Sequence, residues 1–294
     1  FRSAMGKLGG REMTAASDLD LMLLYDAPEG IEASSGDRPL MLSTYYTRLT
    51  QRLIAALSAP TAEGRLYDVD FRLRPSGNKG PVATRLAGFV DYQTTEAWTW
   101  EHMALTRARV IAGDDGLKRQ VEGAIETVLA TPRNTEKVRA DVLEMRQAIE
   151  AEKGGTDRWD LKQAAGGLVD IEFIAQYLML VHGPTSPSVL ATNTGIVLHR
   201  LQEAGLLSAG EADTLLPAYR LYSSLTQVLR LAIDGAFDPR QAPGGLMDLV
   251  IRAGEAPSLA SLEARLDEAQ IAVRAAFERI VGPMSTTERG RAHV

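Results

Sequence analysis

Alternation of apolar and polar residues near the start of the chain predicts a β-strand between Ser17 and Tyr25. One face of this strand carries Leu19, Leu21, Leu23 and Tyr25, and the other carries Asp18, Asp20, Met22 and Leu24. Residues 1–5 should form the end of another strand that leads into the glycine turn Gly9-Gly10. We expect that the sequence begins inside this element and that a longer protein supplies the strand or helix before it.

A second alternating segment runs from Leu66 to Pro75 and has one wholly charged face. The charged face carries Asp68, Asp70, Arg72 and Arg74, and the opposite face carries Tyr67, Val69, Phe71 and Leu73. Placed beside the first strand, in antiparallel or other neighbouring order, this segment would bring a third carboxylate to Asp18 and Asp20. Its arginines would add guanidinium groups of the kind that bind phosphates bidentately.

The rest of the pattern predicts helices, at first mixed with strands and then alone. A polar loop at 27–38 precedes a helix at about 39–59, and helical segments run from Leu86 through Arg109. After Arg133, apolar residues recur every three or four positions, as in a helical bundle, at 138–149, 168–181, 197–207, 215–233 and 259–280. We therefore predict an α+β fold with a small mixed sheet and helices at 1–130, an all-helical bundle domain at 135–284 and a flexible tail at 285–294.

The spacing of Asp18 and Asp20 suits a divalent metal ion. At a strand rise of about 3.3 Å per residue, their side chains leave one face with Cα atoms roughly 6.6 Å apart. Near apolar packing, two ionised carboxylates repel each other unless a cation neutralises them, and Mg²⁺ prefers such oxygen ligands. Together with Asp70 and the arginines, they are typical of nucleotidyl transfer. The alternatives are polar residues at the mouth of a strand, and an exposed amphipathic strand with cross-strand ion pairs.

Composition and charge exclude several classes of protein. Of the 294 residues, 45% are hydrophobic, which is enough for a sizeable core, and none is a cysteine that could form disulfides or zinc–thiolate sites. A net charge of −6 and a pI near 5.4 argue against a broad nucleic-acid surface and favour a protein partner. The chain has no apolar run of membrane-spanning length and no signal-peptide pattern, so we expect a cytoplasmic protein without a membrane partner.

An ordered set of motifs along the chain resembles those of the glutamine synthetase adenylyltransferases. The motifs are Gly6–Glu12, Ser17–Leu21, Asp70–Gly77, Glu96–His102, Arg107–Arg109, Trp159–Lys162 and Gly166–Phe173. That family is bifunctional and much longer, with an N-terminal half that removes AMP from glutamine synthetase by phosphorolysis and a C-terminal half that adds it. The motifs at 74–78 and 96–101 are similar to those of the adding half. The resemblance therefore implies a C-terminal adenylyltransferase fragment with a polymerase-beta-like nucleotidyltransferase fold.

The resemblance also implies a set of site residues. It implies that Gly9, Gly10 and Ser17 bind the triphosphate of ATP, and that Asp18, Asp20 and Asp70 bind Mg²⁺ and are catalytic. Arg72 and Arg74 are the next candidates for the nucleotide, although either could instead pair with Asp68 or Glu12. A glycine pair lets the backbone approach a phosphate, but by itself it is more often a plain turn.

The implied reaction transfers AMP from ATP to a tyrosine hydroxyl of glutamine synthetase and releases pyrophosphate, in control of nitrogen assimilation. A PII signalling protein is implied as a further partner. Two other functions stay open, which are phosphorolytic removal of AMP from glutamine synthetase and a non-catalytic docking module for glutamine synthetase or PII.

Three aromatic residues and a lysine have two readings each. We interpret Trp98, Trp100 and Tyr92 as packing residues rather than as a binding site for adenine. Lys162 and the turn Gly166-Gly167, which precedes a predicted helix, form either a second anion site or a solvated lysine beside an ordinary helix start.

Overall fold

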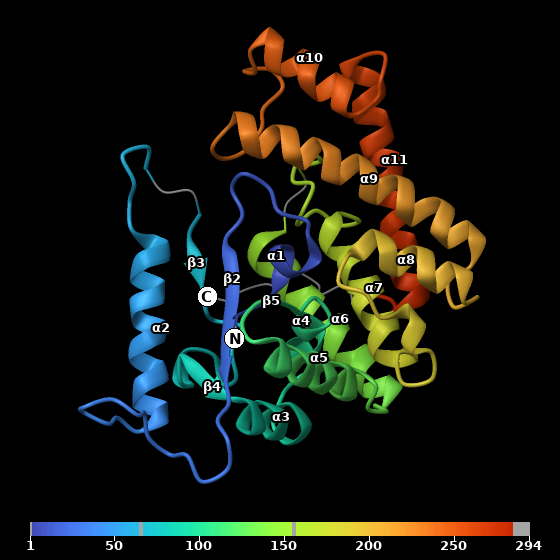
Figure 1. Ribbon diagram of the computed structural model, residues 1–294. Coiled ribbons are helices and arrows are strands. Elements are labelled where there is room, and N and C mark those ends of the chain that lie inside the picture. The colour runs from blue at the N-terminus through green and yellow to red at the C-terminus, as the bar shows by residue number, and fades with distance from the viewer. Residues whose placement is uncertain (1, 65–66, 155–156, 285–294) are drawn as a thin grey trace, which may run out of the picture. The chain divides into compact units, whose positions relative to one another are not determined.

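The computed structural model describes residues 2–64, 67–154 and 157–284. Within these residues the chain forms five strands, eleven α-helices and two short 3-10 helices (Figure 1). This confirms the predicted α+β class. The predicted tail at 285–294 lies outside the described residues.

By the contacts among its residues, the chain divides into two compact units. The first comprises Phe1–Arg133 and Leu178–Leu206, and the second comprises Asn134–Tyr177 and Leu207–Val294. Residues 178–206, which lie inside the predicted bundle range 135–284, make most of their contacts with the first unit. Among these contacts are hydrogen bonds from Asn193 and Thr194 to Gly10 and Glu12.

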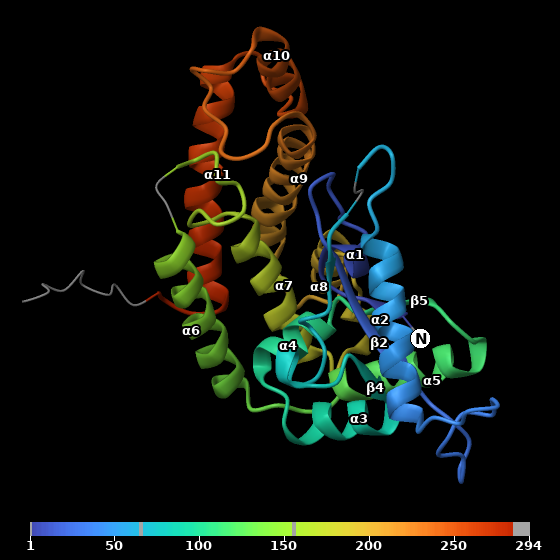
Figure 2. The same cartoon turned by 90° about the vertical axis from the view of Figure 1, so that its left-hand side faces the viewer.

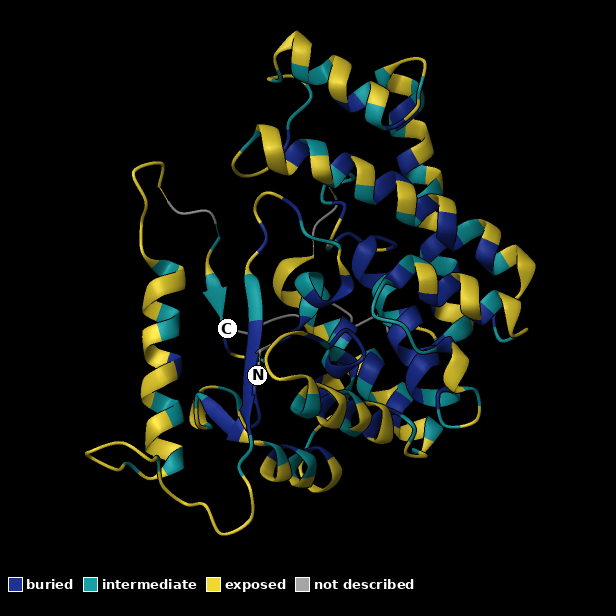
Figure 3. Cartoon of the chain, viewed as in Figure 1, coloured by how far each residue is buried: buried dark blue, intermediate teal, exposed yellow. Residues whose placement is uncertain are grey.

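The first unit contains a mixed sheet with the order β3-β2-β1-β5, in which β4 also pairs with β2. The strands are β1 (Arg2–Ala4), β2 (Leu19–Tyr25), β3 (Val69–Asp70), β4 (Ala83–Arg85) and β5 (Arg109–Ala112). β1 is antiparallel to β2 and β5, whereas β3 and β4 run parallel to β2. The central strand β2 is dark along most of its length in Figure 3, because it is buried from Leu21 to Tyr25.

The two faces of β2 follow the predicted alternation. Leu21, Leu23 and Tyr25 pack into one core cluster together with residues of α2 (Leu42–Ser58). Tyr25 stacks on Tyr46 of α2, with ring centroids 4.2 Å apart. On the other face Met22 and Leu24 are also buried. Asp20 therefore stands at the end of an apolar face.

The second predicted strand is much shorter than expected. β3 has only two residues, Val69–Asp70, and its neighbour Arg72 donates both its backbone N–H and its Nε–H to the Asp70 carboxylate. The chain then turns, with Ser76 in the left-handed region at φ 58°, before a 3-10 helix at Gly77–Lys79. Arg72 and Arg74 therefore do not continue a common strand face with Asp70, which corrects the prediction for 66–75.

Helices complete the first unit, and one strand lies where a helix was predicted. The helices are α1 (Gly6–Gly10), α2 (Leu42–Ser58), α3 (Leu86–Thr95), α4 (Thr99–Leu105), α5 (Asp115–Leu129), α8 (Thr194–Glu203) and the 3-10 helix Pro187–Val189. The predicted helical region reached Arg109, but that residue begins β5. β5 forms here because β1 offers it an antiparallel partner, with Ala4 paired to Arg109.

The second unit is helical. Its helices are α6 (Thr135–Lys153), α9 (Ala209–Ala232), α10 (Gly244–Ala253) and α11 (Leu259–Ile280), and α7 (Leu168–His182) begins in it. α9 and α11 lie side by side in both Figure 1 and Figure 2. The predicted helices are confirmed, whereas α10 was not predicted. Across the described part of the chain, none of the helices has the length and apolar character needed to span a membrane.

Candidate active site

Asp20 and Asp70 lie next to each other in the sheet. They are register partners in the parallel pair of β2 and β3, which places their side chains on the same face. Asp18 precedes β2 and is exposed, whereas Asp20 and Asp70 are partly buried. Parallel pairing of a two-residue strand thus brings together carboxylates that are about fifty residues apart in the sequence.

The environment of Asp20 disfavours its ionised form. Burial raises the pKa of Asp20 from its ordinary value of 3.8 to about 6, and the negative charges of Asp70 and Asp18 act in the same direction. The positive charges of Arg107 and Arg72 lower this pKa in part. The site therefore contains more negative charge than its own arginines neutralise, which is the electrostatic condition that favours a bound cation.

The raised pKa of Asp20 is expected to make the stability of the protein depend on pH. The unfolded chain releases the Asp20 proton near pH 3.8 and the folded chain near pH 6, so the folded state binds more protons between these values. Wild-type stability should therefore fall relative to Asp20→Asn as pH rises from about 4 to about 6. Urea denaturation in EDTA at several pH values measures the difference. A constant difference across this range would contradict the raised pKa.

The surroundings of Asp70 favour its ionised form, in contrast to those of Asp20. Burial by itself would raise the pKa of Asp70, but hydrogen bonds from the side chain and backbone of Arg72, and its charge, leave that pKa lowered. The guanidinium of Arg72 pairs with the Asp70 carboxylate, while its own side chain is 70% exposed. The Asp70 carboxylate, which the sequence predicts to bind a metal ion, is thus paired with Arg72.

Gly6 explains how the Asp20 carboxylate fits against the chain. A Cβ atom built on Gly6 would lie 2.3 Å from Oδ2 of Asp20, and Gly6 has a φ of +50°. The backbone N–H of Met5 also donates to the Asp20 carbonyl at 2.9 Å. The first residue of α1 must therefore be glycine for the carboxylate to keep its position.

Substituting Gly6 by alanine tests this fit. We expect Gly6→Ala to destabilise the protein by at least about 1–2 kcal/mol, which is the cost of the left-handed conformation alone. The collision with Asp20 adds to that cost. Gly123→Ala is the matched control, because Gly123 lies within α5 with no atom within 4 Å of an added Cβ. The control should be stabilised by up to about 1 kcal/mol. Equal denaturation midpoints for both variants would contradict the contact.

Gly9 and Gly10 are buried against other segments of the chain. A Cβ on Gly9 would lie 1.8 Å from the Arg107 carbonyl oxygen, and one on Gly10 would lie 2.9 Å from that of Thr192. Both glycines are therefore required by backbone packing, whichever ligand the turn binds. The Ser17 hydroxyl is also engaged, since it accepts from the backbone N–H of Thr14 at 2.9 Å.

Two arginines that precede or begin β5 hold α1 in place. Arg107 donates from Nε to the Gly6 carbonyl at 3.1 Å, and its Nη2 pairs with the Glu12 carboxylate. Arg109 donates to the carbonyls of Leu8 and Gly9 at 2.9 and 3.1 Å. In the sequence, only the alternation Arg-Ala-Arg at 107–109 gives a signal for this role.

The start of α8 closes the same network. Oε1 of Glu12 accepts from the backbone N–H of Thr194 at 2.7 Å, and Nδ2 of Asn193 donates to the Gly10 carbonyl at 3.1 Å. Glu12 thus links Arg107 to α8, and its bond with Thr194 joins residues 182 positions apart. These contacts were not predicted, because no local pattern marks them.

The other sequence candidates lie in different environments. Arg74 is 8% exposed and donates to the carbonyls of Phe71 and Gly80, so its guanidinium is not free to point at the carboxylates. Trp98 and Trp100 are 69% and 41% exposed, and their interpretation as packing residues is wrong. Each is an apolar residue at the surface of α4 or its start. Tyr92 donates its hydroxyl to Glu101 at 2.8 Å.

The fit of this site to a metal ion rests on its donor chemistry. In the described part of the chain, no group of three or more His, Asp or Glu side chains is arranged to hold a metal ion. The Asp70 carboxylate faces Arg72, so the three aspartates do not form a ready-made cage. Asp20 and Asp18 nevertheless supply hard oxygen donors and excess negative charge, which suit Mg²⁺.

Comparison with known proteins finds two family models that match successive regions of the chain. Residues 3–124 match a family model described as glutamate-ammonia ligase adenylyltransferase, and residues 137–280 match one described as GlnD PII-uridylyltransferase. The first match contains Asp18, Asp20 and Asp70, together with the residues that hold α1.

Curated relatives are similar over nearly the whole chain. A bifunctional glutamine synthetase adenylyltransferase/adenylyl-removing enzyme of Rhizobium meliloti (strain 1021) is 55% identical over 280 residues, which are 94% of this chain and 28% of that protein. Proteins of the same name from Rhodopseudomonas palustris (strain TIE-1) and Xanthobacter autotrophicus (strain ATCC BAA-1158 / Py2) are each 53% identical over 279 residues, 95% of this chain and 28% of theirs. The chain thus spans a little over a quarter of the length of these relatives.

Proposed function

We propose that this chain transfers AMP from ATP to a tyrosine hydroxyl of glutamine synthetase in an Mg²⁺-dependent reaction that releases pyrophosphate. The observation that carries the proposal is the pairing of Asp20 with Asp70 beside Asp18, inside the region that matches the glutamate-ammonia ligase adenylyltransferase family. The names of the similar proteins support the substrate and the acceptor. Under this proposal the first unit has the polymerase-beta-like nucleotidyltransferase fold, and the reaction takes place in the cytoplasm.

The proposed roles follow the positions of the side chains. Asp18 and Asp20 would hold Mg²⁺ with Asp70, and the metal would supply neutralisation of the phosphate charges. The triphosphate of ATP would lie over the turn of Gly9, Gly10 and Ser17, which Arg107 and Glu12 hold rigid. Arg72 has an exposed guanidinium that can reach a phosphate once it leaves Asp70. Arg74 would shape the turn after β3 from its buried position.

In the transfer step, the tyrosine oxygen forms a bond to the α-phosphorus while the bond from that phosphorus to the oxygen that bridges to the β-phosphate breaks, and pyrophosphate leaves. A phenol has an ordinary pKa of about 10, so its proton must be lost as the bond forms. We assign Asp70 to accept this proton and pass it to solvent, because its lowered pKa keeps it ionised at neutral pH. The chain contributes mainly positioning and charge.

The test uses ATP labelled at the α-phosphate, Mg²⁺, this chain and unmodified glutamine synthetase. We expect label on glutamine synthetase and an equal amount of pyrophosphate, both abolished by EDTA. Stable binding to glutamine synthetase in a pull-down without any label transfer would contradict the enzymatic proposal and favour the docking module. A PII protein added in the same assay shows whether it is a partner.

Phosphorolytic removal of AMP is the second candidate, because the similar proteins are named as both adenylyltransferases and adenylyl-removing enzymes. The same site would then take adenylylated glutamine synthetase and orthophosphate. Incubation of these two with the chain would form ADP if this candidate is correct. Absence of ADP, together with label transfer from ATP, would assign the chain to the adding reaction.

A further inference from the structure

The second unit contains a pocket of about 400 Å³ that the proposed transfer does not use. Residues 157–162 form one side, and the last turns of α9 with the chain after it form the other. Its lining residues include Trp159, Lys162, Leu229, Arg230, Ile233 and Phe237. The volume lies within the range of pockets that bind small molecules, roughly 300–1,000 Å³.

Two basic side chains line the pocket without a partner. The ammonium of Lys162 and the guanidinium of Arg230 belong to exposed residues and make no ion pair or side-chain hydrogen bond with other described residues. Trp159 is 8% exposed, and its indole N–H is covered by the protein itself. An anionic group would therefore meet two unpaired cations at this pocket.

The two carboxylates that line the pocket accept hydrogen bonds from the loop backbone. Oδ1 of Asp157 accepts from the backbone N–H of Trp159 at 2.9 Å, and Oδ1 of Asp160 accepts from that of Gln163 at 3.0 Å. The lining thus has two acidic and two basic side chains, and of these only the basic ones have no partner among the described residues.

The rest of the pocket is apolar. Trp159 and Phe237 meet edge to face, with ring centroids 4.7 Å apart and an interplanar angle of 76°. Leu229 and Ile233 of the α9 end extend this wall. A ligand with a flat or apolar body would bury that body against these side chains while its charged end meets Lys162 and Arg230.

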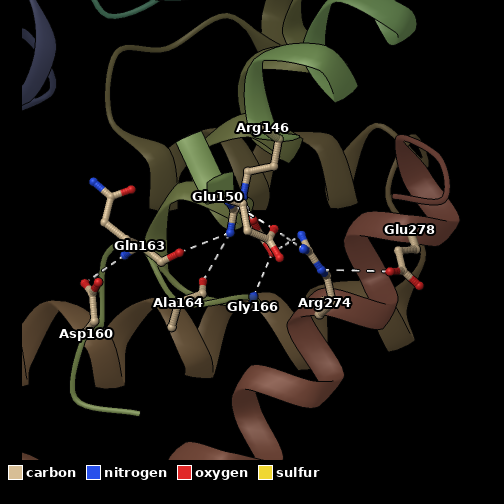
Figure 4. Close-up of polar contacts among 9 residues, drawn as sticks. Arg146, Glu150, Asp160, Gln163, Ala164, Gly166, Arg274 and Glu278 are labelled. Carbon is tan, nitrogen blue, oxygen red and sulfur yellow. Dashed lines mark hydrogen bonds and ion pairs between the residues drawn. The ribbon is translucent and has the colours of Figure 1, made fainter. Parts of the chain in front are cut away.

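A buried ion-pair cluster holds the pocket loop in shape. Arg146 donates to the carbonyls of Gln163 and Ala164 at 3.2 and 3.3 Å (Figure 4). Asp170 accepts from the Gly166 N–H at 2.7 Å. Nε2 of Gln270 donates to the carbonyl of Arg158 at 2.8 Å. Because these hydrogen bonds already order the loop, a ligand would not have to order it on binding.

We propose that this pocket binds a small organic anion, with a phosphate or carboxylate group on Lys162 and Arg230 and an aromatic or apolar body against Trp159 and Phe237. The site is separate in sequence from the aspartates of the first unit, and its occupancy does not depend on nucleotidyl transfer.

The three tryptophans of the chain are Trp98, Trp100 and Trp159, which allows a direct test. In a Trp98→Phe/Trp100→Phe background, Trp159 is the sole source of tryptophan fluorescence and of an indole N–H signal in NMR spectra. Phenyl phosphate and benzoate are the probes, with inorganic phosphate and phenol as half-ligands. We expect saturable changes in both signals with at least one complete probe, and binding about tenfold weaker or more with either half-ligand, since each lacks one set of contacts.

Variants then assign the binding to the pocket. Lys162→Ala/Arg230→Ala should weaken the bound probe by about tenfold or more, because charge-assisted hydrogen bonds are lost. Lys153→Ala/Arg252→Ala, two exposed positions of the same unit outside the pocket lining, should leave affinity unchanged. The relative affinity of the two probes identifies the anionic group. The absence of saturable change with both probes, or unchanged affinity in the pocket variant, would overturn the proposal.

Asp18→Asn/Asp20→Asn separates this site from the proposed active site. If the pocket is correct, this variant keeps the Trp159 response to the probe whether or not AMP transfer is lost. A response that disappears in this variant while circular dichroism stays native would place the probe at the aspartates and contradict the pocket.

Discussion

Replacing Asp20 by alanine is expected to abolish Mg²⁺-dependent AMP transfer, and Asp18→Ala should do the same. Loss of a carboxylate that holds the metal removes several kcal/mol of charge stabilisation, which corresponds to a decrease in rate of roughly a thousandfold or more. The fold should survive, because burial and neighbouring carboxylates disfavour the ionised Asp20 side chain in the metal-free protein. Label transfer from ATP to glutamine synthetase measures the rate, and circular dichroism checks the fold.

Asp91→Ala is the matched control for this loss. Asp91 is an exposed aspartate of α3 in the same unit, outside the sheet edge that carries Asp20 and Asp70. It should retain full transfer activity. Normal turnover by either Asp18→Ala or Asp20→Ala would contradict the assignment of these carboxylates. Equal loss in Asp91→Ala would indicate a general effect on folding or solubility.

Replacing Asp170 by alanine is expected to lower the free energy of unfolding by about 3–5 kcal/mol. The change removes the buried carboxylate paired with Arg146 and leaves this buried guanidinium only the partly exposed Glu150 as a counter-ion. The side chains of Arg146 and Asp170 are both 0% exposed, and they form an ion pair through Nε and Oδ1. Oδ2 of Asp170 also accepts from Arg274 at 3.1 Å and from the Gly166 N–H at 2.7 Å. Urea denaturation followed by circular dichroism measures the change.

Glu278→Ala provides the comparison within the same cluster. Glu278 is 45% exposed, and its Oε1 lies 3.9 Å from Nε of Arg274 (Figure 4). An exposed pair of this kind contributes about 0–1 kcal/mol, so this variant should unfold close to wild type. If Asp170→Ala were no less stable than Glu278→Ala, the buried cluster would not have the stabilising role assigned to it.

The same cluster shows how a motif can be visible in sequence while its role is not. The run from Trp159 to Phe173 contains Lys162, two glycines and Asp170, and it suggested an anion site or an ordinary helix start. In the structure, Asp170 points into a buried arginine cluster, and Gly166 packs its Cα against the carbonyl of Gln270. Lys162 lines a pocket whose other side comes from α9, which no local pattern could indicate.

Local patterns alone were enough to predict the alternation of β2, the helices of the second unit other than α10, and the α+β class. They succeed because side-chain direction in a strand or helix depends on residues two to four positions apart. Only the tertiary structure decided that β3 would pair with β2 in parallel and set Asp70 beside Asp20, and that Gly6 would press against Asp20. It also decided that Arg107, Glu12 and Asn193 would join across the chain. Those contacts join residues from 14 to 183 positions apart, and their geometry depends on how whole elements pack together.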